Sequence, residues 1–303
     1  MILRHIKTAA VSYEDELYGV PFDSGVAALF YRTDYLSEIG YTEEDMQDLT
    51  WEEYLSLGEQ LKTKGHMLQT YNPNDIAEFQ IMLQSAGKWF TNEKGEADFI
   101  DNAALEECYS IFKQLNEADY TKVVSDWTEF AGAINSGEVA CVLRGCWMTS
   151  TLMAEESQSG KWALAPIPKM NAEGATHYSN QGGSSWFVLN DSPNSEIAAD
   201  FLAKTFGSST ELYNTLLKEK SIIGTFLPAT DVEAYEETSE FFSNQQVNKL
   251  LGDWMTKIPA VDTGAFSAEA QNSLVSVTPA ILEGGDLAEN LATAEEQFKQ
   301  SIQ

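Results

Sequence analysis

Carboxylates are the most numerous side chains in this sequence that could take part in covalent chemistry. The 303 residues include 47 Asp and Glu, and adjacent pairs occur at Glu43-Glu44 and Glu155-Glu156. Two facing acids are what glycoside hydrolysis requires. At this acidic content such pairs are expected by chance, so they carry almost no information about catalysis.

The usual catalytic signatures are missing from the sequence. It contains no G-x-S-x-G elbow, Walker loop, H-E-x-x-H motif or Rossmann glycine fingerprint. Its three histidines, His5, His66 and His177, are scattered in polar surroundings that are typical of surface positions. We therefore assign no catalytic residue, no metal ligand and no cofactor.

Aromatic side chains at the ends of predicted strands are a stronger indication of a site. Trp147 follows such an end, Trp186 follows Gly182-Gly-Ser-Ser, and Phe226 lies in a loop between Gly and Pro. Ligands of α/β proteins bind at the carboxyl ends of strands, where an aromatic face can stack on a pyranose ring. Taken singly, each residue is more often part of a core. Three further tryptophans on helical stripes are assigned to the core: Trp51, Trp127 and Trp254.

Asp23 and a glycine pair could add polar recognition. Asp23 follows a strand and Pro21, so its carboxylate could accept two hydrogen bonds from vicinal sugar hydroxyls. Capping of its own turn is equally compatible with this position. Gly182-Gly183 permits positive φ and a close backbone approach to a ligand or to a crossing chain, but an ordinary hinge would need the same.

Charge and composition restrict the classes of partner. With 18 basic residues the formal net charge is −29, which disfavours nucleic acid and anionic lipid as partners.

The length suggests about two domains. Three cysteines do not make a disulfide framework in a chain of this length: Cys108 is expected in the core, while Cys141 and Cys146 flank a strand and could approach each other. We find no membrane-spanning run and no secretory signal.

Helical stripes and short apolar runs alternate along the chain, which predicts α/β layers. Thr50 and Glu53 predict a capping box at the start of a helix that ends near Gly65. Asp101 is a candidate cap for the helix that follows it. The other expected elements are helices at about 75–86, 101–117, 126–136, 195–207, 209–220, 239–251, 269–283 and 286–302, and strands at 139–143 and 162–165.

Several motifs in order resemble the family 1 extracellular solute-binding proteins, the maltodextrin-binding type that deliver sugars to ABC importers. The motifs are Tyr18-Gly-Val-Pro21, Leu29-Phe-Tyr-Arg32, Thr50-Trp-Glu-Glu-Tyr54, Gly137-Glu-Val-Ala140, Gly145-Cys-Trp147, Ala165-Pro-Ile-Pro168, Gly182-Gly-Ser-Ser-Trp186, Ala198-Ala-Asp-Phe-Leu202 and Leu227-Pro-Ala229. They extend over practically the whole chain, and it is their order that is specific.

The resemblance implies a type II periplasmic-binding-protein fold, in which crossing strands join two α/β lobes. Residues 1–24 and 182–235 would form the first lobe, and residues 25–181 and 236–303 the second. The ligand would be a mono- or oligosaccharide bound between the lobes and passed to ABC transporter permease subunits, outside the cytoplasm. The implied ligand-binding residues are Asp23, Trp147, Gly183, Ser184, Trp186 and Phe226.

The resemblance also implies an incomplete first lobe. Members of the family normally begin with roughly a hundred further residues, which include a signal peptide and a lipid-anchoring cysteine that tethers the full-length form to the membrane. We therefore expect this chain alone to bind sugar poorly.

Two other functions stay open at this point. A glycoside hydrolase would use paired carboxylates at the aromatic cleft. An acidic interaction protein would retain the cleft only as a vestige and would bind a protein partner instead.

Overall fold

The computed structural model describes residues 7–8, 10–13, 16–92, 94–230 and 232–303, and it is built around one sheet. Strand β4 (Ala27–Arg32) lies between β7 (Cys141–Gly145) and β8 (Trp162–Ala165) and runs antiparallel to both, with Leu29 opposite Leu143 and Ala165. Backbone bonds from β7 and the residue before it to residues 67 and 68 extend the sheet to β5 (Gln69–Tyr71). Strand β6 (Thr121–Val123) then pairs with β5 in parallel.

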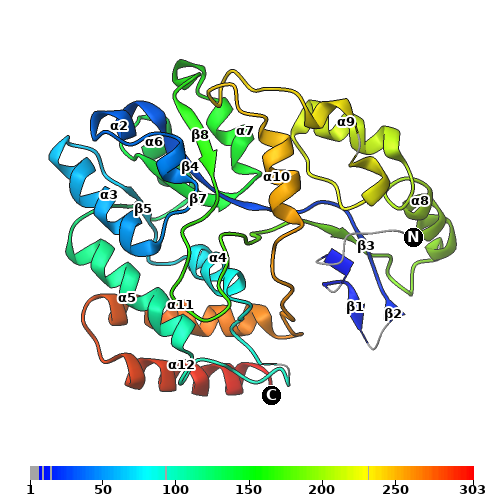
Figure 1. Cartoon of the computed structure of the whole chain (residues 1–303). Coiled ribbons are helices and arrows are strands. Elements are labelled where there is room, and N and C mark those ends of the chain that lie inside the picture. The colour runs from blue at the N-terminus through cyan, green and yellow to red at the C-terminus, as the bar shows by residue number, and fades with distance from the viewer. Residues whose placement is uncertain (1–6, 9, 14–15, 93, 231) are drawn as a thin grey trace.

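Both faces of this sheet are apolar, and helices cover each of them (Figure 1). Along β4, Ala27, Leu29 and Tyr31 belong to one buried cluster, whereas Ala28 and Phe30 belong to another, as the two-residue period of a strand requires. The first cluster packs against α2 (Thr33–Glu38), α3 (Trp51–Thr63), α4 (Ala77–Ser85), α5 (Ala103–Glu117), α11 (Ser267–Leu282) and α12 (Leu287–Ser301). The second packs against α6 (Trp127–Asn135), α7 (Met148–Met153) and α10 (Val247–Met255). The predicted α/β class is confirmed.

Local signals placed some helix ends correctly and others wrongly. The capping box predicted at Thr50 and Glu53 is present. The N-cap of α5 is Asn102 rather than Asp101, because Asp101 takes a left-handed φ of 59° that no helix can begin with. The helix expected at 239–251 begins only at Val247, since residues 239–245 form a closed turn instead. Short 3₁₀ helices complete the fold: η1 (Glu44–Met46), η2 (Glu156–Gln158), η3 (Leu227–Ala229) and η4 (Glu233–Tyr235).

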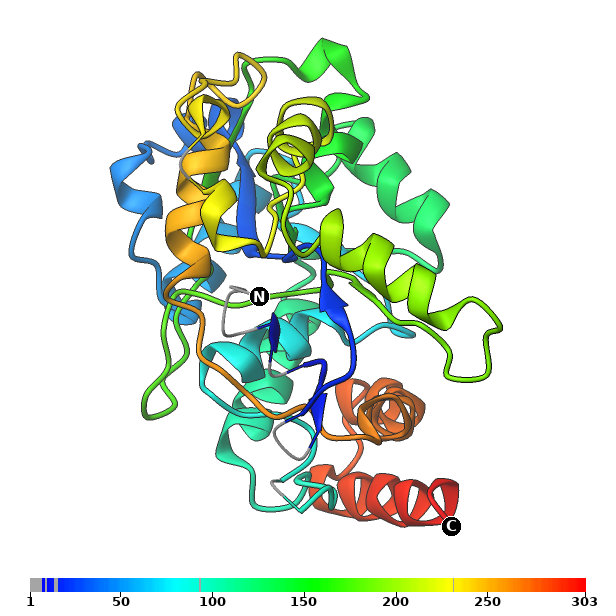
Figure 2. The same ribbon diagram turned by 90° about the vertical axis from the view of Figure 1, so that its right-hand side faces the viewer.

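A smaller part of the chain extends from the sheet through two crossing segments (Figure 2). Strand β3 (Val20–Pro21) pairs antiparallel with β9 (Ser185–Trp186), and beside them lie β1 (Ser12–Tyr13) and β2 (Glu16–Leu17). Helices α8 (Ser195–Lys204) and α9 (Thr210–Lys220) follow β9. Leu217 and Ile223 share a buried cluster with the sheet, so the end of the segment predicted for the first lobe packs on the larger body. The boundaries of the two lobes stay a prediction, and residues 1–6 lie outside the described residues.

Helix α8 buries none of its ten residues. Ile197 and Phe201 lie four residues apart on one side of it and are 72% and 59% exposed, and we call this pair the α8 face. Phe187 and Leu189, in the loop before the helix, are exposed as well. A group of exposed apolar side chains of this kind marks a candidate interaction surface. Within the described ranges, no helix is long and apolar enough to cross a membrane.

The three cysteines are all free and buried. Cys108 lies in the core as predicted, but the approach of Cys141 to Cys146 that was considered possible does not occur. Cys141 belongs to the buried cluster on one side of the sheet, and Cys146, in the turn after β7, belongs to the cluster on the other side. Burial raises the pKa of both thiols to about 12.

The thiols should therefore be unreactive in the native state. At pH 8 we expect a disulfide reagent such as DTNB to modify none of the three cysteines within minutes, and to modify all three after unfolding in urea. Rapid reaction of any thiol in native buffer would show that its segment opens readily.

The α8 face should bind an apolar dye. We expect the double variant Ile197→Gln/Phe201→Gln to lose most of the native-state fluorescence of ANS. Both positions are exposed, so the free energy of unfolding should change by less than about 0.5 kcal/mol. Ile100→Gln, at an exposed isoleucine in a different part of the chain, is the matched control. A stability loss well above that value in the double variant would mean that the face is covered.

Candidate functional site

A cavity of about 210 Å³ lies at the carboxyl ends of the parallel strands β5, β6 and β7. Four segments supply its lining: the loop after β5, the start of α6, the junction of β7 with α7, and the crossing segment. The lining residues are Asn72, Asp75, Asp126, Trp127, Phe130, Arg144, Trp147 and Gln181. The position agrees with the rule that α/β sheets bind ligands at the carboxyl ends of their strands.

Two tryptophans present exposed aromatic surface at this cavity. Trp147 is 39% and Trp127 is 52% exposed, and their ring centroids are 5.9 Å apart at an angle of 47°. Trp127 stacks in turn on Phe130, with centroids 5.2 Å apart. Tryptophans that remain exposed in a well-packed protein provide flat apolar surface with polar groups at the edge, which suits stacking on a sugar ring.

The orientation of Trp147 is fixed by the crossing segment. Its Nε1 donates a hydrogen bond to the carbonyl of Gln181 at 3.2 Å, and the backbone N–H of Gly145 donates to the side-chain oxygen of Gln181 at 2.8 Å. A Cβ on Gly145 would lie 2.5 Å from Nε1 of Trp147, so only glycine permits this close approach.

Arg144 forms the charged floor of the cavity and is almost fully buried. Its guanidinium pairs with Glu78 of α4 and, at 3.3 Å, with Asp75, and its carbon lies 5.0 Å from the centroid of the Phe130 ring. Asp75 also accepts a hydrogen bond from the N–H of Ala77. Burial raises the pKa of Glu78, and the neighbouring Arg144 opposes that shift. Glu78 lies beneath the arginine and is not among the lining residues.

The cavity can therefore recognise a polar ligand. It combines two carboxylates, two carboxamides and a fixed arginine with the aromatic pair. Carboxylates and amides accept and donate hydrogen bonds to vicinal hydroxyls. None of the lining residues is a cysteine, histidine or serine that could serve as a nucleophile or base.

Asp23, Gly183 and Ser184 come together on the crossing segments, but they do not line this cavity, and their role in binding stays a prediction. The carboxylate of Asp23 accepts a hydrogen bond from the backbone N–H of Ser184, and the carbonyl of Ser184 accepts one from Phe22. Gly183 has a φ of 83°, and a Cβ there would lie 2.7 Å from Lys7 and from the carbonyl of Asp23. The alternative considered for Asp23 was capping of its own turn, but the backbone N–H that its carboxylate accepts from belongs to Ser184 on the other crossing segment.

Trp186 and Phe226 lie away from the cavity. Trp186 packs against Phe22 and Phe206, with ring centroids 5.9 and 5.1 Å apart. Phe226 is only 8% exposed and stacks on Tyr213 in a small cluster of its own. In this structure the ring of Phe226 is not exposed to a ligand, because it is used in packing against Tyr213. The role of Trp186 in binding stays a prediction.

Sequence reasoning missed Trp127. It was assigned to a core stripe because it stands three residues before Phe130, whereas it is the first residue of α6 and lies over the cavity. Trp51 and Trp254 are buried, as expected. The signal that could have identified Trp127 is its place directly after a strand and a capping aspartate, the same argument that singled out Trp147.

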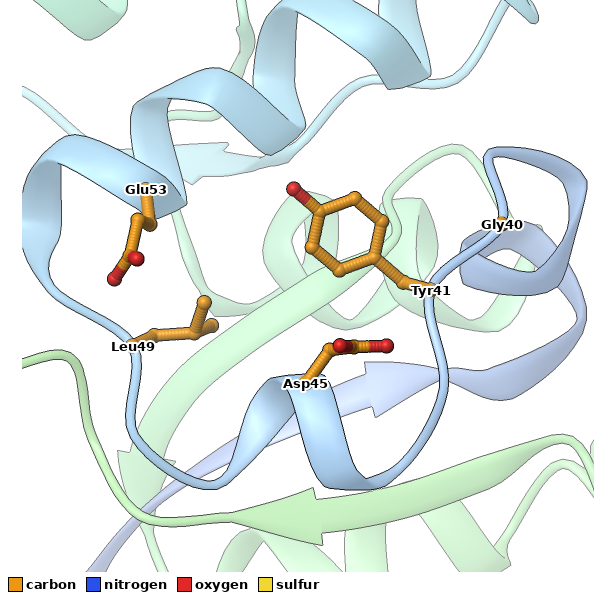
Figure 3. Close-up of a pocket in the computed structure, with 5 residues that line it drawn as sticks. All are labelled: Gly40, Tyr41, Asp45, Leu49 and Glu53. Atoms are coloured by element: carbon orange, nitrogen blue, oxygen red, sulfur yellow. The ribbon is translucent and has the colours of Figure 1, made fainter.

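A second hollow, of about 270 Å³, contains two carboxylates but offers no acid pair for hydrolysis. Figure 3 shows the ring of Tyr41 extending between the segments that carry Asp45 and Glu53. Asp45 accepts hydrogen bonds from Thr42, and Glu53 accepts them from Thr50, which lowers the pKa of each carboxyl. A general acid needs a raised pKa, so these groups are turn and helix caps.

Removal of the Arg144 side chain should destabilise the protein, because Glu78 would then be a buried carboxylate without a paired cation. We expect Arg144→Met to lower the free energy of unfolding by about 3–5 kcal/mol, because it leaves a buried carboxylate without its partner. The pKa of Glu78 is already raised and should rise further, so the loss should be larger at pH 8 than at pH 5, where Glu78 takes up a proton. Urea denaturation at both pH values measures this difference.

The matched control is Arg32→Met, because Arg32 is buried to a similar degree but pairs with the partly exposed Asp34. Its loss should be smaller and nearly independent of pH in this range. Equal losses in the two variants would mean that Glu78 is not a buried unpaired charge in Arg144→Met.

Comparison with known proteins places the chain in a family. Residues 3–248 match the model described as "Bacterial extracellular solute-binding protein". The chain is 40% identical over 298 residues to the lactose-binding protein of Rhizobium radiobacter, covering 98% of this chain and 71% of that protein. A crystal structure of an extracellular solute-binding protein of family 1 has a TM-score of 0.82 at 16% identity, covering 100% of this chain and 77% of the other. The ABC transporter associated binding protein of B. animalis subsp. lactis Bl-04, in complex with beta-1,6-galactobiose, has a TM-score of 0.78 at 19% identity, covering 99% and 76%. These similarities confirm the expected fold, and the chain belongs to the bacterial extracellular solute-binding proteins.

Proposed function

We propose that this chain contributes a sugar-binding surface, at the cavity of Trp127 and Trp147, to a binding protein that delivers a mono- or oligosaccharide to an ABC transporter. The observation that carries the proposal is the exposed tryptophan pair beside Asp75 and Asp126 at the carboxyl ends of three strands. The 40% identical relative is a lactose-binding protein, and one structural neighbour was solved with galactobiose, which supports a sugar as ligand.

In the proposed mechanism a sugar ring stacks on the tryptophans while carboxylates and amides bind its hydroxyls. The two lobes, residues 1–24 with 182–235 and residues 25–181 with 236–303, would close around it about the crossing segments. Asp23, Gly183, Ser184 and Trp186 would approach the ligand from the crossing segments and the first lobe on closure. The closed form would dock on permease subunits outside the cytoplasm, and a lipid anchor would tether the binding protein to the membrane.

The size of the cavity supports weak binding by this chain alone. At about 210 Å³ it is smaller than the roughly 300–1,000 Å³ typical of ligand pockets, as expected if one lobe supplies only part of the enclosure. A ligand held on one side also keeps more of its surface in water. We therefore expect dissociation constants nearer to millimolar than to micromolar, which corresponds to about −4 kcal/mol.

Glycoside hydrolysis, the alternative considered from the sequence, finds no support in these observations. The relatives described above are binding proteins rather than enzymes. The two carboxylates of the cavity are engaged by Arg144 and by the start of α6, respectively.

Binding should depend on Trp147. We expect lactose or galactobiose to change the tryptophan fluorescence of the protein, and Trp147→Ala to weaken binding about five- to thirtyfold through loss of stacking worth ~1–2 kcal/mol. Phe187→Ala, which removes an exposed aromatic outside the cavity, is the control and should bind as the unaltered chain does. Micromolar binding that survives Trp147→Ala would contradict the proposed site, and turnover of a fluorogenic glycoside would contradict the proposed class of protein.

A further inference from the structure

A third cavity, of about 280 Å³, lies near the cavity of Trp127 and Trp147. It lies where the ends of α5 and α11 meet β5 and the edge strand β6. Its lining is Tyr71, Pro73, Asn116, Asp119, Thr121, Val123, Pro279, Leu282 and Glu283. We call it the α11 cavity.

Residues that are neighbours in sequence line the two cavities. Asn72 lines the cavity of Trp127 and Trp147, while its neighbours Tyr71 and Pro73 line the α11 cavity. Val123 lines the α11 cavity, and Asp126, three residues later, lines the first. Three residues of extended chain reach at most about 10 Å, so a ligand of a few linked rings can lie across both cavities.

The chemistry of the α11 cavity resembles that of the first. Tyr71, Pro73, Val123, Pro279 and Leu282 supply apolar surface, and carboxylate, amide and hydroxyl groups lie around it. An apolar floor with a few hydrogen-bonding groups is the composition of a small-molecule site. Acidic groups at its rim disfavour an anion and leave acceptors for hydroxyl donors.

Tyr71 gives a second indication that a ligand is accommodated here. Its hydroxyl is buried, and among the described residues it has no hydrogen-bond partner. Burial, with the charges of Glu78 and Glu283 as smaller causes, raises the pKa of Tyr71, so the group remains a neutral O–H donor. An unpaired buried donor costs about 1–3 kcal/mol, which an accepting hydroxyl oxygen could offset.

We infer that the α11 cavity is an extension of the sugar site that holds a further unit of an oligosaccharide whose first units stack on Trp127 and Trp147. This inference rests on the proposed function and narrows the ligand from any sugar to chains of at least three units. The added contact is open to solvent and would be too weak to bind a free monosaccharide. When the further sugar unit is linked to a unit already held on the tryptophans, its contact with the α11 cavity forms at high effective concentration and raises the overall affinity.

The experiment compares affinities for lactose, a galactosyl-lactose trisaccharide and the corresponding tetrasaccharide, measured by NMR titration. For the unaltered chain we expect the longer sugars to bind at least about fivefold more tightly than lactose. They should also shift the methyl resonances of Val123, which lactose should not do.

Two variants test the cavity itself. Val123 is 63% exposed, so Val123→Arg should fold normally while its longer side chain obstructs the cavity. In this variant we expect the trisaccharide and the tetrasaccharide to bind less than about twofold more tightly than lactose, and the affinity for lactose to be unchanged. Glu283→Gln, at the exposed cap of α11, should reduce the gain partially. Ile100→Arg places the same charge at an exposed site outside both cavities and should have no effect.

The outcomes separate the two proposals. If lactose binds in a Trp147-dependent manner but longer sugars bind no better, the extension is wrong and the proposed function stands. A gain with length that persists in Val123→Arg also overturns the extension. If none of the three sugars binds, the proposed function fails and this inference fails with it.

Discussion

The buried Arg144 is the interaction on which the candidate site depends. It stands at the end of β7, pairs with Glu78 on α4 and Asp75 in the loop after β5, and lies over Phe130 on α6. These contacts join the segments that line the cavity on the larger body. A guanidinium serves this purpose well because its planar donors bind two carboxylates while its face stacks on an aromatic ring. The arginine adds a side-chain connection to the backbone pairing of β5 with β6, which already joins the loop after β5 to the chain that leads into α6.

The pair is kept for geometry more than for stability. Taking two charges out of water costs about as much as their attraction returns, so an apolar replacement of the whole group could be as stable. An apolar replacement would remove one of the two contacts that orient Asp75, leaving the hydrogen bond from the N–H of Ala77. The polar lining of the cavity therefore follows from a buried charge that packing alone would not favour.

The sequence was sufficient where local rules decide the outcome. The capping box at Thr50 and the alternation of Ala27 to Tyr31 depend on the backbone and on a two-sided sheet, and both were predictable. Asp101 failed as a cap because the choice between two adjacent polar residues depends on a left-handed turn that propensity does not encode. Trp127 and Phe226 failed for a different reason: whether an aromatic ring is buried or exposed depends on segments distant in sequence. Trp127 looked like a core residue and is exposed, whereas Phe226 looked like a site residue and is packed on Tyr213.

The exposed α8 face and the strong acidity of the chain have opposite effects on association. Ile197, Phe201 and the loop before them would favour contact with other polypeptide. A net charge of −29 makes two copies of the chain repel each other, which opposes contact through the same surface. Polypeptide that covered this face would therefore need either little negative charge or enough apolar area to overcome the repulsion.

The crossing segments connect the tryptophan site to the smaller part of the chain, because Gln181 binds both Gly145 and Trp147 and precedes the chain that leads toward α8. Because Trp147 donates to the backbone carbonyl of Gln181, a movement of the smaller part about residues 181–184 would change the support of the Trp147 ring.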